Sequence, residues 1–268
     1  MPVNEEHRTK RPVRMVFTSR AGGASAIPYD SFNLGHHVGD DPAAVAANRE
    51  RLKRVTGLDD IVWMEQLHTN TVTVVDGPQD EPVPATDAIV TTQRRLGLAV
   101  LVADCTPVLL VDVAAGVIAA AHAGRLGARN GIVVNTVREM EKLGAQPERI
   151  QVVMGPAASG KNYEVPKEMA EDVERRLPGS KTRTSKGTWG IDVRAGLIRQ
   201  LMGLGITAIE SDPRCTIEDE DFFSYRREGT TGRQAGLIVS GDEAWNTINE
   251  YVNSVAPELV PRMSKYEP

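Results

Sequence analysis

Three side chains with the chemistry of metal ligands occur along the sequence: His68, Cys105 and His122. Cys105 and His122 belong to two apolar stretches that flank a short turn, AAG at residues 114–116. If these stretches form a β-hairpin, the numbers of paired residues sum to about 229 or 230, and Cys105 comes within about two residues of His122 on the ladder. Diagonal neighbours there are ~7 Å apart, so a thiolate and an imidazole can share a metal or act as a catalytic dyad.

His68 supplies the third group. It stands in QLHTNTV, after one strand candidate and before another, and functional side chains are often mounted at such strand ends. Two histidines and one cysteine with an open fourth position are typical of a catalytic zinc, which activates water or polarises a substrate. Taken singly, a cysteine at a strand end is more often a small core residue, and a loop histidine is mostly polar surface. The residues alone leave these interpretations open.

Arginine-bearing loops are the second chemical feature. Arg20 follows a strand candidate and precedes the glycine-rich turn of TSRAGGAS, and Arg226 and Arg233 lie in FFSYRREGTTGRQAG. Guanidinium groups in such loops can hold a phosphate by paired hydrogen bonds. Asn33, in SFNLG, has the sequence character of a turn residue and completes the candidate substrate-binding set. Cys215, in DPRCTIED, has no histidine near it in sequence, and we interpret it as structural.

The elements that must position these groups are short strands rich in β-branched residues, and helices with recognisable capping and terminating residues. The predicted strands cover residues 13–17, 61–65, 71–75, 87–92, 98–103, 107–113, 116–122, 150–154, 206–211, 222–225 and 235–240. The predicted helices cover residues 42–56, 130–143, 166–177, 193–204 and 242–254. Strands outnumber helices without strict alternation, which favours a mixed α/β (α+β) fold in which helices flank mixed β-sheets.

Composition narrows the function classes. The 268 residues are 41% hydrophobic and 25% charged with a net charge of −5, as in a globular protein with no general affinity for nucleic acid. Two cysteines, no secretory signal and no apolar run of ~20 residues predict a cytoplasmic protein without a membrane span. Five histidines are too few for the copper centres of a blue multicopper oxidase. Neither GxxxxGK[ST] nor GxGxxG occurs after a strand, so nucleotide phosphate loops are unsupported.

One domain, residues 13–268, after a flexible tail at residues 1–12 is the expected organisation, because neither repeats nor a linker interrupt the chain. Along it stand, in order, TSRAGG, SFNLG, QLHTNTV, TDAIVT, ADCTPVLLVD, AHAG, GPAASGKNYEV, DVRAGLIRQL and CTIEDEDFFSYRREGTTGR. Together these motifs resemble the laccase-domain family, also called multicopper polyphenol oxidase-like proteins. The resemblance covers nearly the whole chain and implies a monomeric sandwich of mixed sheets with helices outside.

The resemblance also implies an activity. Members of the family are described as purine nucleoside phosphorylases with adenosine deaminase and methylthioadenosine phosphorylase activity. Their zinc ligands correspond to His68, Cys105 and His122, and the expected substrates are purine nucleosides and phosphate. Cys105, His122 and the adjacent Asp104 are then the candidate catalytic residues, with Asp104 as a possible proton carrier. The chain departs from the family in AHAGRLG, where the family usually has AHAGWRG and the arginine stands one place later than Arg125 does here.

Two rival functions stay open at this point. The first is a cytoplasmic amidase that edits peptidoglycan precursors, using zinc-bound water or Cys105 as nucleophile with His122 as base. The second is a non-catalytic zinc-binding module. An assay of nucleosides with phosphate, set beside a muramyl-peptide substrate and a metal analysis, separates all three.

Overall fold

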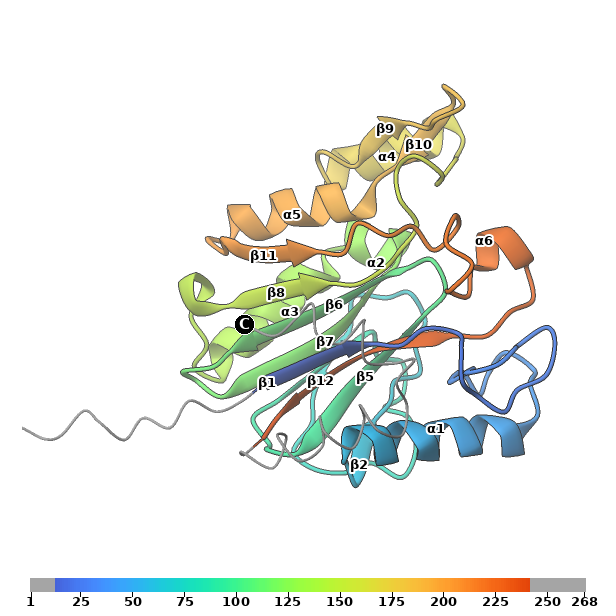
Figure 1. Ribbon diagram of the computed structural model, residues 1–268. Coiled ribbons are helices and arrows are strands. Elements are labelled where there is room, and N and C mark those ends of the chain that lie inside the picture. The colour runs from blue at the N-terminus through green and yellow to red at the C-terminus, as the bar shows by residue number, and fades with distance from the viewer. Residues whose placement is uncertain (1–12, 242–268) are drawn as a thin grey trace, which may run out of the picture.

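Two mixed β-sheets stacked face to face form the frame of the computed structural model, which describes residues 13–241 (Figure 1). The predicted N-terminal tail and the predicted helix at residues 242–254 lie outside the described residues. The larger sheet has the strand order β11 (Ala208–Ser211), β8 (Gln151–Met154), β6 (Thr106–Asp112), β7 (Val117–Ala123), β4 (Ala88–Thr91), β3 (Val72–Val74). The smaller sheet has the order β1 (Val13–Phe17), β12 (Gln234–Ser240), β5 (Leu96–Val102), β2 (Asp60–Val62).

Within residues 13–241 the structure has six α-helices, most of which pack outside the two sheets. They are α1 (Pro42–Thr56), α2 (Arg125–Arg129), α3 (Ile132–Lys142), α4 (Lys167–Arg176), α5 (Val193–Gly203) and α6 (Tyr225–Glu228). In Figure 1, α1 lies against the smaller sheet, and α5 lies on the opposite side of the molecule. A one-turn helix, η1 (Pro147–Arg149), precedes β8. No helix within residues 13–241 is both long and apolar enough to cross a bilayer.

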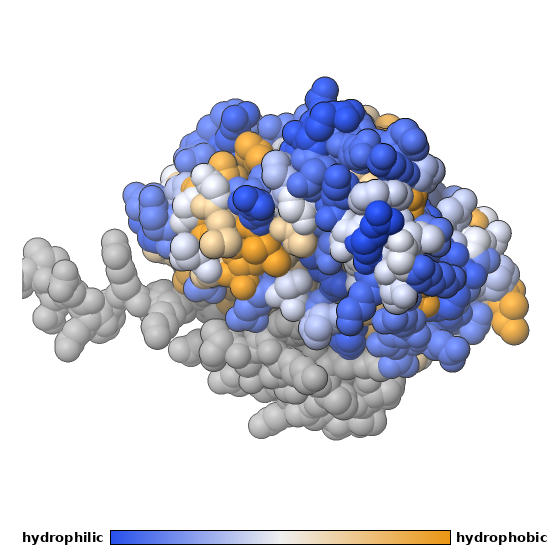
Figure 2. All heavy atoms as spheres, turned by 90° about the horizontal axis from the view of Figure 1, so that it is seen from above, coloured by the Kyte–Doolittle hydropathy of each residue, from blue (hydrophilic) through white to orange (hydrophobic). Residues whose placement is uncertain are grey.

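Alternation along the strands divides the core into layers. On β5, Leu98 and Val100 join the cluster between the sheets, whereas Leu101 points to the cluster under α1. On β7, Ile118 faces the space between the sheets, and Ala119 faces the helices outside. Because successive side chains of a strand point to opposite faces, strands buried on both faces must be apolar throughout. The face seen from above in Figure 2 is largely hydrophilic, with one broad apolar patch and smaller apolar spots toward its edges. The predicted mixed α/β sandwich flanked by helices is confirmed.

The helices begin and end at capping residues that the sequence indicated. Asp41 caps α1 by accepting a hydrogen bond from the Ala43 backbone N–H at 2.9 Å, and Gly57 ends the helix with a left-handed φ of 65°. Asp192 caps α5 through the Ala195 N–H at 3.0 Å. The predicted helical stretch that starts at residue 130 instead contains a turn at Gly131, with φ 85°, between α2 and α3.

The predicted strand at residues 222–225 is wrong. Phe222 and Phe223 are buried, as the aromatic pattern suggested, but they lie in a loop. The side-chain amide of Gln234 accepts from the Phe223 N–H at 2.8 Å and donates to its carbonyl at 3.0 Å, which replaces a strand partner. Ser224 then caps α6 through the Arg227 N–H. The pattern also failed to indicate the short hairpin of β9 (Lys181–Arg183) and β10 (Trp189–Ile191).

The register of the β6–β7 hairpin agrees with the prediction. Thr106 pairs with Ala123 and Pro107 with His122, so paired numbers sum to 229. At the turn end of the hairpin the buried Asp112 carboxylate accepts from the Ala115 N–H at 3.0 Å and from Arg149 Nε at 3.0 Å. These contacts fix the turn, and the turn fixes which residues meet at the open end.

Candidate metal centre and substrate pocket

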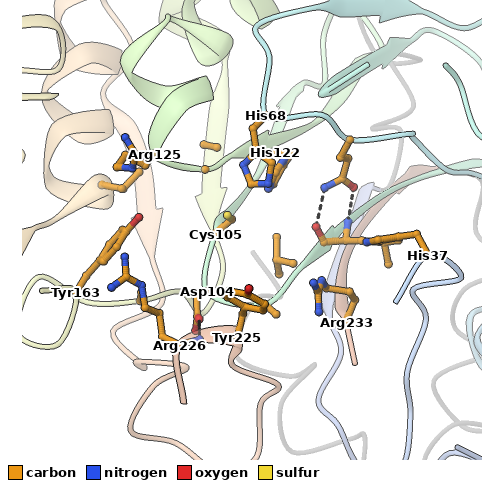
Figure 3. Close-up of a pocket in the computed structure, with 18 residues that line it drawn as sticks. His37, His68, Asp104, Cys105, His122, Arg125, Tyr163, Tyr225, Arg226 and Arg233 are labelled. Carbon is orange, nitrogen blue, oxygen red and sulfur yellow. Dashed lines mark hydrogen bonds between the residues drawn. The ribbon is translucent and has the colours of Figure 1, made fainter. Parts of the chain in front are cut away.

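His68, Cys105 and His122 meet at the open end of this hairpin. Their ligand atoms all lie within 4.8 Å of one another, and the two imidazole rings stand edge to face with centroids 4.7 Å apart (Figure 3). Cys105 immediately precedes β6, His122 is the penultimate residue of β7, and His68 lies in the loop between β2 and β3. The expected ligand set is therefore assembled as a candidate metal site.

The glycine of AHAG keeps this cluster open. A Cβ atom at Gly124 would lie 2.7 Å from His68 Nδ1 and 2.9 Å from Cys105 Sγ, closer than packed atoms allow. The backbone at Gly124 has φ −72° and ψ 170°, an extended conformation that any residue adopts. Gly124 is thus required for space and not for conformation. Two imidazoles and a thiolate around a space of this kind fit a metal ion that takes nitrogen and sulfur ligands.

The cluster is electrostatically coupled. Burial opposes ionisation of Cys105, but the neighbouring His122 and His68 outweigh it and lower the pKa of the thiol to about 6. Burial also opposes protonation of His122, yet Cys105 and Asp87 raise the pKa of the imidazole to about 9. Cys105 is therefore favoured as a thiolate at neutral pH, and the thiolate is the form that binds metals. Cys215 is buried elsewhere and accepts a hydrogen bond from the Ser159 N–H at 3.4 Å.

Asp87 is the charged residue beside the candidate ligands that the sequence analysis missed; the pocket residues Tyr163 and Tyr225 were missed as well. Its side chain is buried next to the ligands, and Oδ1 lies 2.8 Å from His122 Nδ1. Burial acts against the charged carboxylate, but hydrogen bonds from His122 and Thr69 outweigh it and lower the pKa of Asp87 to about 2. The available signal was an acidic residue directly before the apolar strand of TDAIVT.

A pocket of about 360 Å³ opens beside the three ligands. In Figure 3, Arg125, Tyr163 and Arg226 stand on one side of it, and His37 and Arg233 stand on the other. The charged residues that line it are three arginines and one carboxylate, that of Asp104, in a chain whose net charge is −5. The pocket therefore suits an anionic ligand next to the metal ligands.

Contacts within the pocket hold two of its arginines in place. The Arg226 guanidinium stacks on the Tyr163 ring at 4.4 Å and donates to the Glu164 carbonyl at 3.0 Å. Arg233 donates to the carbonyls of the two preceding loop residues at 2.9 Å, and burial lowers the pKa of its guanidinium. Both side chains keep further N–H groups for a ligand, because a guanidinium has five donors.

Asp104 links the candidate metal ligands to the loop that carries Arg226. It has a left-handed φ of 89°, which a non-glycine residue adopts only when its surroundings hold it. Its carboxylate accepts from Thr216 Oγ1 at 2.7 Å and from the Arg226 N–H at 2.7 Å. With both oxygens engaged, the carboxylate fixes Arg226 relative to Cys105. Its role as a proton carrier stays a prediction.

Two residues predicted to bind substrate do not line this pocket. Arg20 pairs with Glu228 at 2.6 Å and Asp30 at 3.3 Å in a separate polar cleft. Asn33 is fully buried, and its Oδ1 accepts from the N–H groups of Gly35 at 2.9 Å and Arg233 at 2.8 Å. Asn33 is a turn residue, as its sequence suggested, and it holds the backbone that carries Arg233.

Known proteins are similar to this chain along most of its length. A family model described as multi-copper polyphenol oxidoreductase laccase matches residues 14–241. A Corynebacterium glutamicum protein named purine nucleoside phosphorylase is 68% identical over 238 residues, which are 87% of this chain and 97% of that protein. A Mycobacterium tuberculosis protein named purine nucleoside phosphorylase is 54% identical over 228 residues, 84% of this chain and 91% of its own.

Solved structures share the fold. YlmD from Geobacillus stearothermophilus matches with a TM-score of 0.80 at 32% identity, covering 86% of this chain and 92% of its own. A Neisseria meningitidis protein matches with a TM-score of 0.77 at 33% identity, covering 87% and 97%.

Replacing Gly124 by alanine tests the space for the metal. Gly124→Ala should weaken zinc binding by at least about tenfold, because the methyl group displaces His68 and Cys105 from their positions. Zinc affinity is measured by competition with a chelator. Gly203→Ala is the control, because a Cβ atom at Gly203, at the end of α5, would have no neighbouring atom within 4 Å. This variant should leave zinc affinity unchanged. Equal zinc affinity in Gly124→Ala and wild type would contradict this account of the site.

Proposed function

We propose, from the premise that the chain belongs to the multi-copper polyphenol oxidoreductase laccase family, that it is a purine nucleoside phosphorylase with a zinc centre. The observation that carries the proposal is the 68% identity to the Corynebacterium glutamicum protein named purine nucleoside phosphorylase, over 97% of that protein's length. The arginine-lined pocket beside His68, Cys105 and His122 supports it, since phosphorolysis needs a phosphate site next to the reacting sugar.

The donor set supports zinc over copper. The described residues offer a single group that could hold a metal ion, and its ligands are two imidazoles and one thiolate. Three such ligands with an open fourth position suit zinc, whereas the copper centres of an oxidase need many more histidines than the five in this chain. We therefore propose one zinc ion and no copper chemistry, although the family is described as multi-copper oxidoreductases.

The reaction we propose is phosphorolysis of adenosine, inosine or methylthioadenosine. A phosphate oxygen forms a bond to the anomeric carbon of the sugar, the bond from that carbon to the purine nitrogen breaks, and the base leaves with the electron pair and takes up a proton. When bound, zinc would polarise the substrate or a water molecule. Arg226 and Arg233 bind the phosphate, and Asp104 keeps Arg226 in place. The exposed ring of Tyr225 offers a stacking surface for the purine.

Deamination of adenosine is the second reaction proposed for the same pocket. It requires water to attack the carbon that bears the amino group, with loss of ammonia, and the open zinc position suits it. The amidase and the non-catalytic zinc module remain as outcomes of the assay, because both would use the same three ligands.

The two cysteines provide a matched test of the proposal. Wild type incubated with adenosine or inosine and phosphate should release the free base, and adenosine should also give inosine. Cys105→Ser should lose zinc and both activities, because a hydroxyl is a far poorer ligand than a thiolate at neutral pH. Cys215→Ser should keep its zinc and both activities. Products are followed by chromatography and zinc by elemental analysis.

Hydrolysis of a muramyl peptide without phosphate-dependent base release would overturn the proposal in favour of the amidase. Stoichiometric zinc with no turnover of either substrate would favour the non-catalytic module. Retention of zinc by Cys105→Ser would contradict the ligand set itself.

The arginines give the next prediction. Arg226→Ala and Arg233→Ala should each raise the KM for phosphate about 10- to 100-fold, because each loses a charge-assisted hydrogen bond of ~1.5–3 kcal/mol. Zinc content should not change. Arg20→Ala is the control, since Arg20 lies in the other cleft, and its KM should stay within about twofold. A raised KM in Arg20→Ala alone would move the phosphate site to that cleft.

A further inference from the structure

We propose that Asp87 is a positioning residue that holds both metal-ligating histidines through one buried carboxylate. The inference rests on the metal centre of the proposed function, but its tests read metal binding and imidazole tautomer and not nucleoside turnover. Asp87 belongs to neither the expected ligand set nor the pocket lining. Its carboxylate contacts both histidine-bearing segments, since Oδ1 faces the His122 ring and the His68 N–H, and Oδ2 faces the N–H groups of Leu67 and Thr69.

The first side is His122. Asp87 Oδ1 lies 2.8 Å from His122 Nδ1, and the Asp87 carbonyl accepts from the His122 backbone N–H at 2.7 Å. The antiparallel register of β4 and β7, with Ala88 opposite Ala121, places the two residues side by side. An ionised carboxylate can only accept, so the hydrogen of the neutral imidazole is held on Nδ1. Nε2 then presents its lone pair to a metal.

The second side is the loop that carries His68. Three consecutive backbone N–H groups point at the same carboxylate, from Leu67 at 3.2 Å, His68 at 3.0 Å and Thr69 at 2.7 Å. Thr69 Oγ1 adds a fourth donor at 2.7 Å. His68 has a left-handed φ of 60°, a conformation that a non-glycine residue keeps only when contacts hold it. The carboxylate of Asp87 supplies those contacts.

One side chain thus receives five hydrogen bonds and donates none. An amide of the same shape cannot replace it, because its NH₂ group would face an N–H donor either on His122 or on the His68 loop. The Asp87→Asn side chain must therefore release one of the two histidines, or force His122 into the other tautomer. Cys105 has no contact of this kind with Asp87 among the hydrogen bonds of the described residues, so the effect should fall on the histidines.

Asp112 is a matched control. It is equally buried, lies at the other end of the β6–β7 hairpin, and accepts from the backbone N–H groups of Ala115 and Gln146 and from Arg149. Asp112→Asn also removes a buried carboxylate that accepts from backbone N–H groups. The hydrogen-bond partners of Asp112 include no histidine. A difference between the two variants separates positioning of the ligands from a general loss of stability.

The experiment compares wild type, Asp87→Asn and Asp112→Asn as full-length proteins. Zinc affinity is measured by chelator competition, the cobalt-substituted protein by its visible spectrum, and the nitrogen of each histidine that keeps its hydrogen by ¹⁵N NMR of the zinc-saturated protein. Asp87→Asn should bind zinc about 10- to 100-fold more weakly, change the cobalt spectrum and lose the Nδ1–H tautomer of His122. Asp112→Asn should melt at a lower temperature while its zinc affinity and His122 tautomer match wild type.

A second variant keeps the test decisive where Asp87→Asn does not fold. Thr69→Val removes the hydroxyl that donates to Asp87 and accepts from the Thr71 N–H at 3.2 Å. It should weaken zinc binding about fivefold, less than the loss of the whole carboxylate, because the other donors of the His68 loop remain. Unchanged zinc affinity in Asp87→Asn or in Thr69→Val, or equal weakening in Asp112→Asn, would overturn the inference. Absence of nucleoside turnover in a wild type that binds zinc would overturn only the proposed function.

Discussion

The buried carboxylate of Asp87 is the constraint on which the geometry of the site depends. It stands where β4 begins beside β7, and it accepts hydrogen bonds from His122 and from the loop that carries His68. Alternation along the strands makes this possible, because Ile89 on β4 and Ile118 on β7 face the space between the sheets, and Asp87 and His122 lie an even number of residues from them. A slip of one residue in either strand would turn a ligand or its partner away from the centre.

The site combines a rigid part and a loop part. The candidate ligands Cys105 and His122 are mounted at the ends of apolar strands that pack on both faces, so the sandwich fixes the distance between them. The arginines of the pocket come from loops and short helices, as expected for groups that adapt to a ligand. Asp104 joins the two parts, since it precedes Cys105 in the chain and holds the Arg226 backbone through its carboxylate. Ligand and substrate groups are thereby positioned relative to one another.

The sequence predicted those features that depend on residues close together in the chain. The turn at residues 114–116 fixes the hairpin register, so the meeting of Cys105 and His122 followed from arithmetic on residue numbers. Asp87 was missed because its neighbours are set by the choice of β7 as the partner of β4, a contact 35 residues away. Arg20 was predicted to bind phosphate because it precedes a glycine-rich turn; the structure pairs it with Asp30 and Glu228 in another cleft, and its binding of phosphate stays a prediction. The predicted strand at residues 222–225 is wrong because a side chain of β12, distant from local sequence rules, supplies the hydrogen bonds of Phe223.

The central claim is that one metal ion is held by His68, Cys105 and His122 in a chain whose family is described as multi-copper oxidoreductases. The most direct measurement is anomalous X-ray diffraction from crystals of the purified protein, with data on both sides of the zinc and copper absorption edges. The account predicts one zinc peak within bonding distance of the two imidazoles and the thiolate, and no copper peak. A copper signal, or a zinc peak that lies away from these three side chains, would contradict it.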